Sequence, residues 1–283
     1  MNTRLEEIKI HIPYLRLTAR AWGPATGLPV LALHGWLDNA ASFDHLAPLL
    51  PELRLIALDL PGHGLSDHRP PGVHYHFIDF IPDVIAAAEQ LGWQRFALLG
   101  HSLGAGIASF VAAVIPQRIS HLALIEGLGP LSGKADESPA VLARSMRQRT
   151  ALASKGLPVY PSLEDAIKAR FEAGHFSWQA AATLAIRGSQ SVPGGISWRS
   201  DPQLTLTSPI YLTEEQVLAF MNQIKAPTQL ILGESGYLVK RELMAERYAR
   251  IAQLEITVLS GGHHLHLEDP AATARVLASF FNA

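Results

Sequence analysis

The sequence predicts an α/β fold with a mostly parallel sheet of eight strands, helices on both faces and an inserted helical cap. Three observations predict it. Short apolar runs alternate with segments of helical pattern at both ends of the chain, as in a parallel sheet covered by helices. This alternation stops between residues 125 and 228, whereas a crossover between parallel strands needs only about 10 to 12 residues. A Gly-x-Ser-x-Gly turn at residues 100–104 also joins a strand to an apolar helix.

The elements of the core follow in order along the chain. Short apolar segments bounded by Gly, Pro, Asp and Asn predict strands at residues 8–12, 15–21, 30–33, 53–58, 96–99, 122–125, 228–232 and 254–259. Longer segments of helical pattern predict helices at residues 78–91, from residue 104 to about Pro116, and at 240–251 and 270–281. Pro116 ends the second helix because proline cannot continue one.

The long interval in the middle of the chain predicts an inserted domain. We divide the chain into a first core part at residues 1–128, a helical cap at 129–225 and a second core part at 226–283. Cap helices are predicted at 138–153, 162–173 and 213–224, the last two opened by Ser162-x-x-Asp165 and Thr213-x-x-Gln216. Loops rich in Pro and Gly at 192–195 and 201–202 separate the helices, so we expect an irregular cap rather than a bundle.

Composition excludes several classes of function. The 283 residues include 23 Lys and Arg against 25 Asp and Glu, and a net charge of −2 argues against a nucleic-acid-binding surface. Cysteine is absent, which excludes disulfides, Cys-ligated zinc and a thiol nucleophile. Residues 1–12 lack the apolar core of a signal peptide, and no apolar stretch approaches the roughly 20 residues that cross a bilayer. We therefore expect a cytoplasmic protein without a membrane partner.

Ser102 lies in the motif that carries the most chemical information. The glycines of Gly100-x-Ser102-x-Gly104 allow a turn so tight that the serine backbone is strained and its hydroxyl exposed. A serine that only caps the following helix is the alternative. Because a serine hydroxyl is a poor nucleophile at neutral pH, it needs a general base within hydrogen-bond reach.

Four motifs occur in an order that resembles the α/β hydrolase superfamily along nearly the whole chain. They are His34-Gly35, Asp59-x-Pro61-Gly62-x-Gly64-x-Ser66, Gly100-x-Ser102-x-Gly104 and Gly262-His263-x-x-x-x-Glu268-x-Pro270. Residues 34–44, with Trp198-x-x-Asp201-Pro202, more narrowly resemble the serine-hydrolase-like (kraken-type) branch, which consists mostly of uncharacterised carboxylesterases. The resemblance implies the α/β-hydrolase fold and a Ser-His-acid triad. A serine nucleophile excludes the chemistry of the related dehalogenases and epoxide hydrolases, which use Asp.

The resemblance places the general base on the loop after the last strand. Three histidines lie there, His263, His264 and His266. We assign His263 because it directly follows two glycines, which leave room for its imidazole, and we keep His264 as the alternative. Zinc binding by the three is disfavoured, since their i, i+1, i+3 spacing on a loop is no standard ligand pattern.

The third member of the triad departs from the common family pattern. The seventh strand usually ends in Gly-x-x-Asp, but here Gly236 stands in the place of the acid. Glu126, at the tip of the sixth strand, is our first choice for the carboxylate that orients the histidine. Glu234, on the expected loop but two residues early, is the alternative.

The oxyanion of an acyl-transfer reaction needs hydrogen-bond donors. We expect the backbone N–H groups of Leu103, after the nucleophile, and of Trp36, after His34-Gly35, to supply them. The Trp36 side chain is expected to shield the core or to line the substrate pocket. Asp38 is expected to hold this loop by hydrogen bonds, and His63 to be structural.

The resemblance and the triad together imply a serine esterase that cleaves small-molecule esters of short to medium acyl chains, with no cofactor and no metal. A thioesterase, lactonase or C–C bond hydrolase on the same triad is the alternative, as is a binding protein without turnover, which the missing acid at Gly236 motivates. A homodimer is only a weak expectation. Guesses for cap residues that line the pocket are Met146, Phe171, Phe176, Trp178 and Tyr211.

Overall fold

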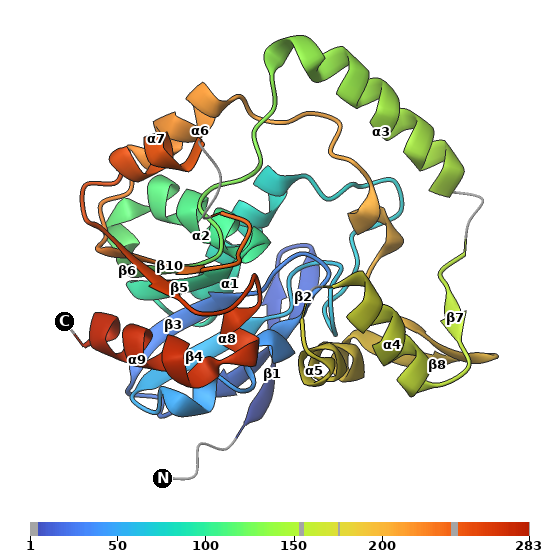
Figure 1. Ribbon diagram of the computed structural model, residues 1–283, viewed down its shortest axis with the longest axis horizontal. Coiled ribbons are helices and arrows are strands. Elements are labelled where there is room, and N and C mark those ends of the chain that lie inside the picture. Colours follow the sequence, from blue (N-terminus) through green and yellow to red (C-terminus); the bar gives the residue numbers. More distant parts are fainter. Residues whose placement is uncertain (1–4, 153–155, 175, 239–242, 283) are drawn as a thin grey trace.

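An eight-stranded sheet forms the centre of the molecule in the computed structural model, which describes residues 5–152, 156–174, 176–238 and 243–282 (Figure 1). Its strands, in spatial order, are β1 (Glu6–Ile12), β2 (Leu15–Trp22), β4 (Leu53–Leu58), β3 (Leu28–Leu33), β5 (Phe96–His101), β6 (Ile119–Ile125), β10 (Thr228–Gly233) and β11 (Leu254–Leu259). The strand β2 runs antiparallel to β1 and β4, and all pairs from β4 to β11 are parallel. The predicted mostly parallel sheet is therefore confirmed.

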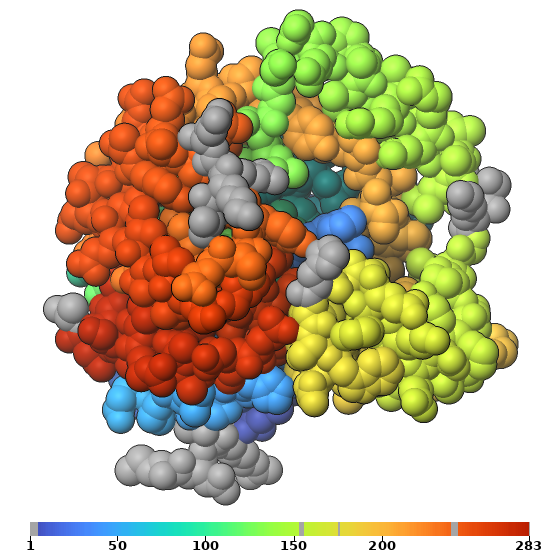
Figure 2. All heavy atoms as spheres, viewed as in Figure 1, coloured from blue at the N-terminus to red at the C-terminus, as the bar shows by residue number. Residues whose placement is uncertain are grey.

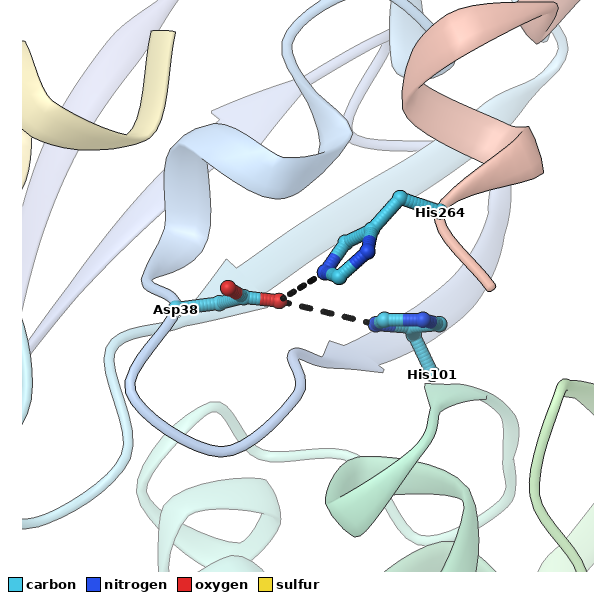
Figure 3. Close-up of side chains that lie close together, drawn as sticks. All are labelled: Asp38, His101 and His264. Atoms are coloured by element: carbon cyan, nitrogen blue, oxygen red, sulfur yellow. Dashed lines mark ion pairs between the residues drawn. The ribbon is translucent and has the colours of Figure 1, made fainter. Parts of the chain in front are cut away.

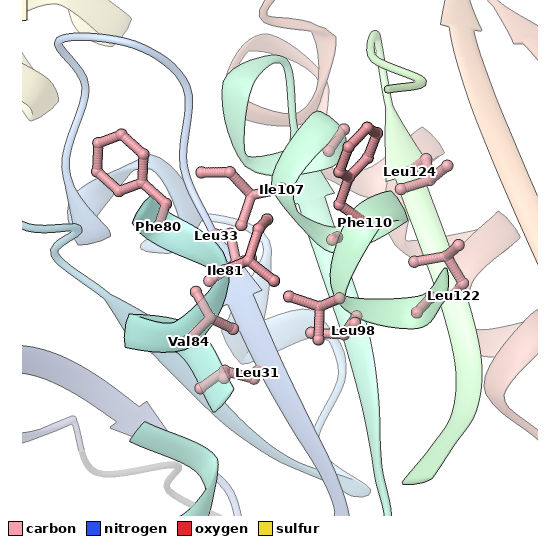
Figure 4. Close-up of a cluster of buried hydrophobic side chains, with 14 of the residues drawn as sticks. Leu31, Leu33, Phe80, Ile81, Val84, Leu98, Ile107, Phe110, Leu122 and Leu124 are labelled. Carbon is pink, nitrogen blue, oxygen red and sulfur yellow. The ribbon is translucent and has the colours of Figure 1, made fainter. Parts of the chain in front are cut away.

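Helices cover both faces of this sheet because its inner strands are apolar on both sides. In β3, Leu31 and Leu33 face the side covered by α1 (Phe80–Gln90) and α2 (Leu103–Val114), where Figure 4 shows them among the helix side chains. Val30 and Ala32 belong to the cluster on the opposite side. That side is covered by α8 (Leu265–Glu268) and α9 (Pro270–Phe281). Full burial of a Leu or Ile contributes about 1.5–3 kcal/mol, so both faces stabilise the fold.

The chain between β6 and β10, here called the insertion (residues 129–225), holds the helices α3 (Ser138–Leu152), α4 (Leu163–Ala173), α5 (Trp178–Gly188) and α6 (Glu214–Met221). The Thr213 capping box forms as predicted, and Ser162 caps α4 by accepting a hydrogen bond from the Asp165 N–H. The helix α5 is not predicted by the sequence analysis. The last residue of the predicted helix 138–153 lies outside the described residues, as do residues 240–242 of the predicted helix 240–251. The helix α7 (Leu243–Ala249) forms in the described part of that second segment and ends two residues before the predicted end.

The insertion also contains a small antiparallel sheet where the sequence analysis expects only helices and loops. Its strands are β7 (Val159–Tyr160), β9 (Gly195–Trp198) and β8 (Ser189–Val192), in that order. Pro193 and Gly194 connect β8 to β9, and Gly194 and Gly195 have φ values of +91° and +147°. These left-handed values are accessible to glycine at little cost, so the Pro-Gly-Gly segment forms a hairpin turn rather than an irregular loop.

Buried polar contacts attach α5 to the core. The Arg187 guanidinium donates to both carboxylate oxygens of Asp59, which follows β4, and to Glu7 on β1. Asn39 donates from its side-chain amide to the Leu184 carbonyl. Figure 1 shows α5 beside β1 and β2, with α4 next to it, and α3 farther from the sheet. No helix in the described ranges is long and apolar enough to span a bilayer.

Candidate active site

Ser102 lies at the turn between β5 and α2, at the carboxyl end of the central strands. Its backbone has φ 51° and ψ −113°, a conformation that costs a non-glycine residue free energy. The flanking glycines are required by close packing. A Cβ atom on Gly100 would lie 2.5 Å from the Ala105 Cα, and one on Gly104 would lie 2.1 Å from the Leu33 carbonyl oxygen. The turn therefore has the strained geometry that the motif predicts.

His263 lies on the loop after β11 and reaches Ser102. Its Nε2 is 2.9 Å from the Ser102 Oγ, and its Nδ1 is 3.2 Å from the Glu126 Oε2. Because a carboxylate only accepts hydrogen bonds, Nδ1 carries the proton and Nε2 is free to accept one from the serine hydroxyl. Burial lowers the pKa of His263, and the hydrogen bond to Glu126 offsets part of this shift. The imidazole is therefore neutral at pH 7, as a general base must be.

Glu126 directly follows β6 and is buried, with 2% of its surface exposed. Besides His263, its carboxylate accepts the N–H groups of Gly233 and Tyr237, each at 2.9 Å. Gly233 ends β10 and Tyr237 follows it, and β10 pairs with β6, so two adjacent strand ends enclose the carboxylate. The three donors hold the carboxylate in one orientation.

Gly236 explains why this site differs from the common family pattern. A Cβ atom at this position would lie 2.2 Å from the Glu126 Oε1 and 2.4 Å from its Cδ and Oε2. The Glu126 carboxylate and an aspartate at position 236 therefore exclude each other sterically. Glu234, the alternative acid, is exposed, and its side chain has no hydrogen bond or ion pair among the described residues.

The two candidate oxyanion donors lie on segments that are tied together next to Ser102. The Gly104 N–H donates to the His34 carbonyl at 3.1 Å, which joins the start of α2 to the loop after β3. The backbone N–H groups of Leu103 and Trp36 donate to no other described residue, so both remain available. The Trp36 side chain is 52% exposed and its Nε1 donates to the Leu204 carbonyl in the insertion; it therefore contributes little to the core.

Asp38 holds its loop, as expected, but through side chains that the sequence analysis does not connect with it. Its carboxylate is buried and contacts Arg170 of α4. It also contacts His101 at the end of β5 and His264, as Figure 3 shows. Burial alone would raise the pKa of Asp38, but the neighbouring His264 and Arg170 outweigh it and hold the pKa well below its usual range. His264 thus contacts Asp38 rather than Ser102.

The other histidines near the site are structural in their contacts. His63 is buried and donates to the Pro61 carbonyl, and burial lowers its pKa to about 3. His266 is buried, and its Nε2 forms a hydrogen bond with the Ser42 hydroxyl. His34 accepts the Leu60 N–H, and burial lowers its pKa to about 4.

A pocket of about 190 Å³ lies between the core and the insertion, next to Asp38. Leu37, Asp38 and Gly64 line it from the core, and residues of α4, α5 and β9 line it from the insertion. None of the five cap residues guessed from the sequence lines this pocket; Phe176 instead packs its ring against His264, with the ring centroids 4.6 Å apart. Figure 2 shows that the surface is hollowed between α3 and α4 on the face of the molecule that is turned toward the viewer.

Comparisons with known proteins agree with this geometry. The family model of the alpha/beta hydrolase fold matches residues 29–270. A serine hydrolase-like protein of Danio rerio is 33% identical over 99% of this chain and 89% of its own. The crystal structure of a hypothetical protein of Pseudomonas aeruginosa PAO1 is 47% identical, with a TM-score of 0.94 over 98% of this chain and 100% of that one. A thioesterase domain from the curacin biosynthetic pathway is 27% identical, with a TM-score of 0.86 over 97% and 99% of the two chains.

Proposed function

Because the chain belongs to the α/β hydrolase family and to its serine-hydrolase-like branch, we propose that it is a serine esterase that cleaves carboxylic esters of short to medium acyl chains. The observation that carries the proposal is the hydrogen-bonded series from the Ser102 Oγ to the His263 Nε2 and from the His263 Nδ1 to Glu126, at 2.9 and 3.2 Å. This series has the residue types and the order of contacts of a nucleophile, a general base and an orienting acid.

Each residue of the series has one task in the first half of the reaction. The Ser102 Oγ attacks the acyl carbon while the His263 Nε2 takes the hydroxyl proton. Glu126 stabilises the imidazolium that forms and keeps the ring in position. The N–H groups of Leu103 and Trp36 donate to the carbonyl oxygen as it gains negative charge, and removal of one such donor costs roughly 2.7–4 kcal/mol.

The second half of the reaction uses the same groups in reverse. His263 gives its proton to the alcohol oxygen, which leaves, and the acyl group remains on Ser102. A water molecule then attacks the acyl-enzyme, with His263 as the base, and the carboxylic acid is released. The insertion (residues 129–225) acts as a cap that encloses the acyl group. An enclosed site of this kind favours short to medium acyl chains over long ones.

A thioesterase is the second candidate, because a thioesterase domain is among the similar structures. Both reactions use the same nucleophile and the same acyl intermediate, so they differ only in the leaving group. Which of the two reactions the protein catalyses depends on whether the part of the site next to His263 accommodates the alcohol or the thiol leaving group.

The test is the hydrolysis of p-nitrophenyl esters from acetyl to palmitoyl by the wild type and by a folded Ser102→Ala variant. We expect turnover that falls from short to long acyl chains and that the variant loses. A maximum at palmitoyl would contradict the expected chain length. The absence of Ser102-dependent turnover on every ester would contradict the esterase, and the same acyl groups offered as thioesters would then test the thioesterase.

A further inference from the structure

Three side chains with metal-binding atoms meet beside the candidate triad. Asp38 follows β3, His101 ends β5 and His264 precedes α8, and Figure 3 shows the three reaching toward one another from these separate segments. The Asp38 Oδ2 lies 3.3 Å from the His264 Nε2 and 3.6 Å from the His101 Nδ1. All three atoms lie within 4.8 Å of one another.

The contacts of His101 determine which of its nitrogens has a free lone pair. Its Nε2 is 2.8 Å from the backbone carbonyl oxygen of His263. A carbonyl only accepts, so Nε2 carries the proton and Nδ1 turns its lone pair toward Asp38.

Two buried acceptor atoms, the Asp38 Oδ2 and the His101 Nδ1, therefore face each other. Neither the Asp38 Oδ2 nor the His101 Nδ1 has a hydrogen bond within the described part of the chain, and both side chains are buried, at 3% and 0% exposure. Arg170 donates only to the other carboxylate oxygen, Oδ1. A buried polar atom without a partner is costly, and a cation that both lone pairs contact removes this cost.

We propose that the Asp38 Oδ2, the His101 Nδ1 and the His264 Nε2 bind a divalent first-row transition-metal ion such as Zn²⁺. Tetrahedral zinc with bonds of about 2.0–2.2 Å places its ligand atoms about 3.3–3.6 Å apart. The two contacts of Asp38 are 3.3 and 3.6 Å long, and the two histidine nitrogens, which lie within 4.8 Å of each other, would move closer when the ion binds. Imidazole and carboxylate are common ligands of these ions.

The surroundings of the three ligands also suit a metal site. A metal-binding histidine usually donates its other ring N–H to a carbonyl or carboxylate, which orients the ring; His101 does this with the His263 carbonyl. The His264 side chain keeps 12% of its surface exposed, and Asp38 lines the pocket of about 190 Å³.

The test uses the chelator-treated protein and two metal ions alone. Isothermal titration with Zn²⁺ measures stoichiometry and affinity, and the absorption of bound Co²⁺ reports its coordination. We expect one equivalent of Zn²⁺, which His264→Gln binds at least about 10- to 100-fold more weakly, since even a change in a residue behind a ligand costs that much. His101→Gln is expected to have the same effect, and circular dichroism establishes that both variants are folded.

Two further variants locate the ion. His11→Gln changes an exposed histidine on β1 and should leave the affinity unchanged. His263→Gln should also retain the ion, because the His263 ring belongs to the triad and not to this set. Equal Zn²⁺ affinity in the wild type and in folded His264→Gln, loss of binding in His263→Gln, or no binding at all would overturn the proposal. None of these readouts depends on esterase activity, so this proposal and the proposed function fail independently.

Discussion

Replacement of Glu126 by Gln tests which carboxylate completes the triad. The Glu126 carboxylate accepts three hydrogen bonds, from Gly233 at 2.9 Å, Tyr237 at 2.9 Å and the His263 Nδ1 at 3.2 Å. A glutamine has one carbonyl oxygen and one NH₂ group. In either orientation of the amide, the NH₂ group therefore meets at least one N–H donor in a buried site. One unsatisfied buried donor costs about 1–3 kcal/mol, which is the expected loss in the free energy of unfolding.

The loss in activity should be larger than the loss in stability. Without the negative charge, the imidazolium of His263 is no longer stabilised and the ring loses its fixed tautomer. The equivalent Asp to Asn change in a serine-protease triad lowers kcat by about 10⁴-fold, and we expect a similar factor here. Since each factor of ten corresponds to about 1.4 kcal/mol, the transition state loses about 5.5 kcal/mol.

The assay is kcat/KM for p-nitrophenyl acetate, with thermal unfolding monitored by circular dichroism. Glu234→Gln is the matched control, because Glu234 is the rival acid and is exposed; it should retain nearly full activity. Equal small losses in the two folded variants would refute the reasoning and would mean that neither carboxylate serves the triad. A large loss only in Glu234→Gln would assign the role to that residue.

Three other predictions follow from the same site and its surroundings. Gly236→Ala should lower kcat and Tm together, because its Cβ would lie 2.2 Å from the Glu126 Oε1 and must displace the carboxylate; unchanged kinetics would contradict this. Burial lowers the pKa of His263 from 6.5, so kcat/KM should fall only as pH drops below 6.5, and a loss that begins above pH 7 would disagree. Burial also lowers the pKa of His34 to about 4 and that of His63 to about 3. Below pH 6.5 the unfolded chain therefore binds more protons than the folded chain. The free energy of unfolding should decrease as the pH falls, and at pH 5 each of the two histidines should lower it by about 2 kcal/mol relative to pH 7.5. Urea unfolding at pH 5 and 7.5 measures the difference, and equal values would count against it.

Ser102 and His263 could be identified from the sequence because short-range patterns mark both positions. The glycines around Ser102 are required where the turn after β5 packs against Leu33 and Ala105, and the glycines before His263 open the loop after β11. These conformational requirements involve only a few consecutive residues, so a short sequence motif is enough to reveal them. Short apolar segments between turn residues likewise predicted the eight strands of the sheet.

The choice between Glu126 and Glu234 depended on distant contacts. Both acids follow strands, but only Glu126 enters the space between β6 and β10, where Gly236 leaves room for its carboxylate. The small sheet of the insertion was missed for a related reason. Its short strands pair through contacts within the insertion, and its Pro-Gly-Gly hairpin resembles a loop in sequence. The helix α5 was missed as well.

The sequence by itself determined the alternation of strands and helices and the strained turn at Ser102. Both depend on side-chain periodicity or on glycine conformation, which act over short stretches of chain, whereas the placement of His263 after the last strand came from the resemblance to α/β hydrolases. Only the tertiary structure showed that Asp38, His101 and His264 lie together, because the two histidines are 163 positions apart in the sequence. The carboxyl ends of parallel strands meet at one edge of the sheet, and which side chains touch there depends on strand order and packing rather than on any local pattern.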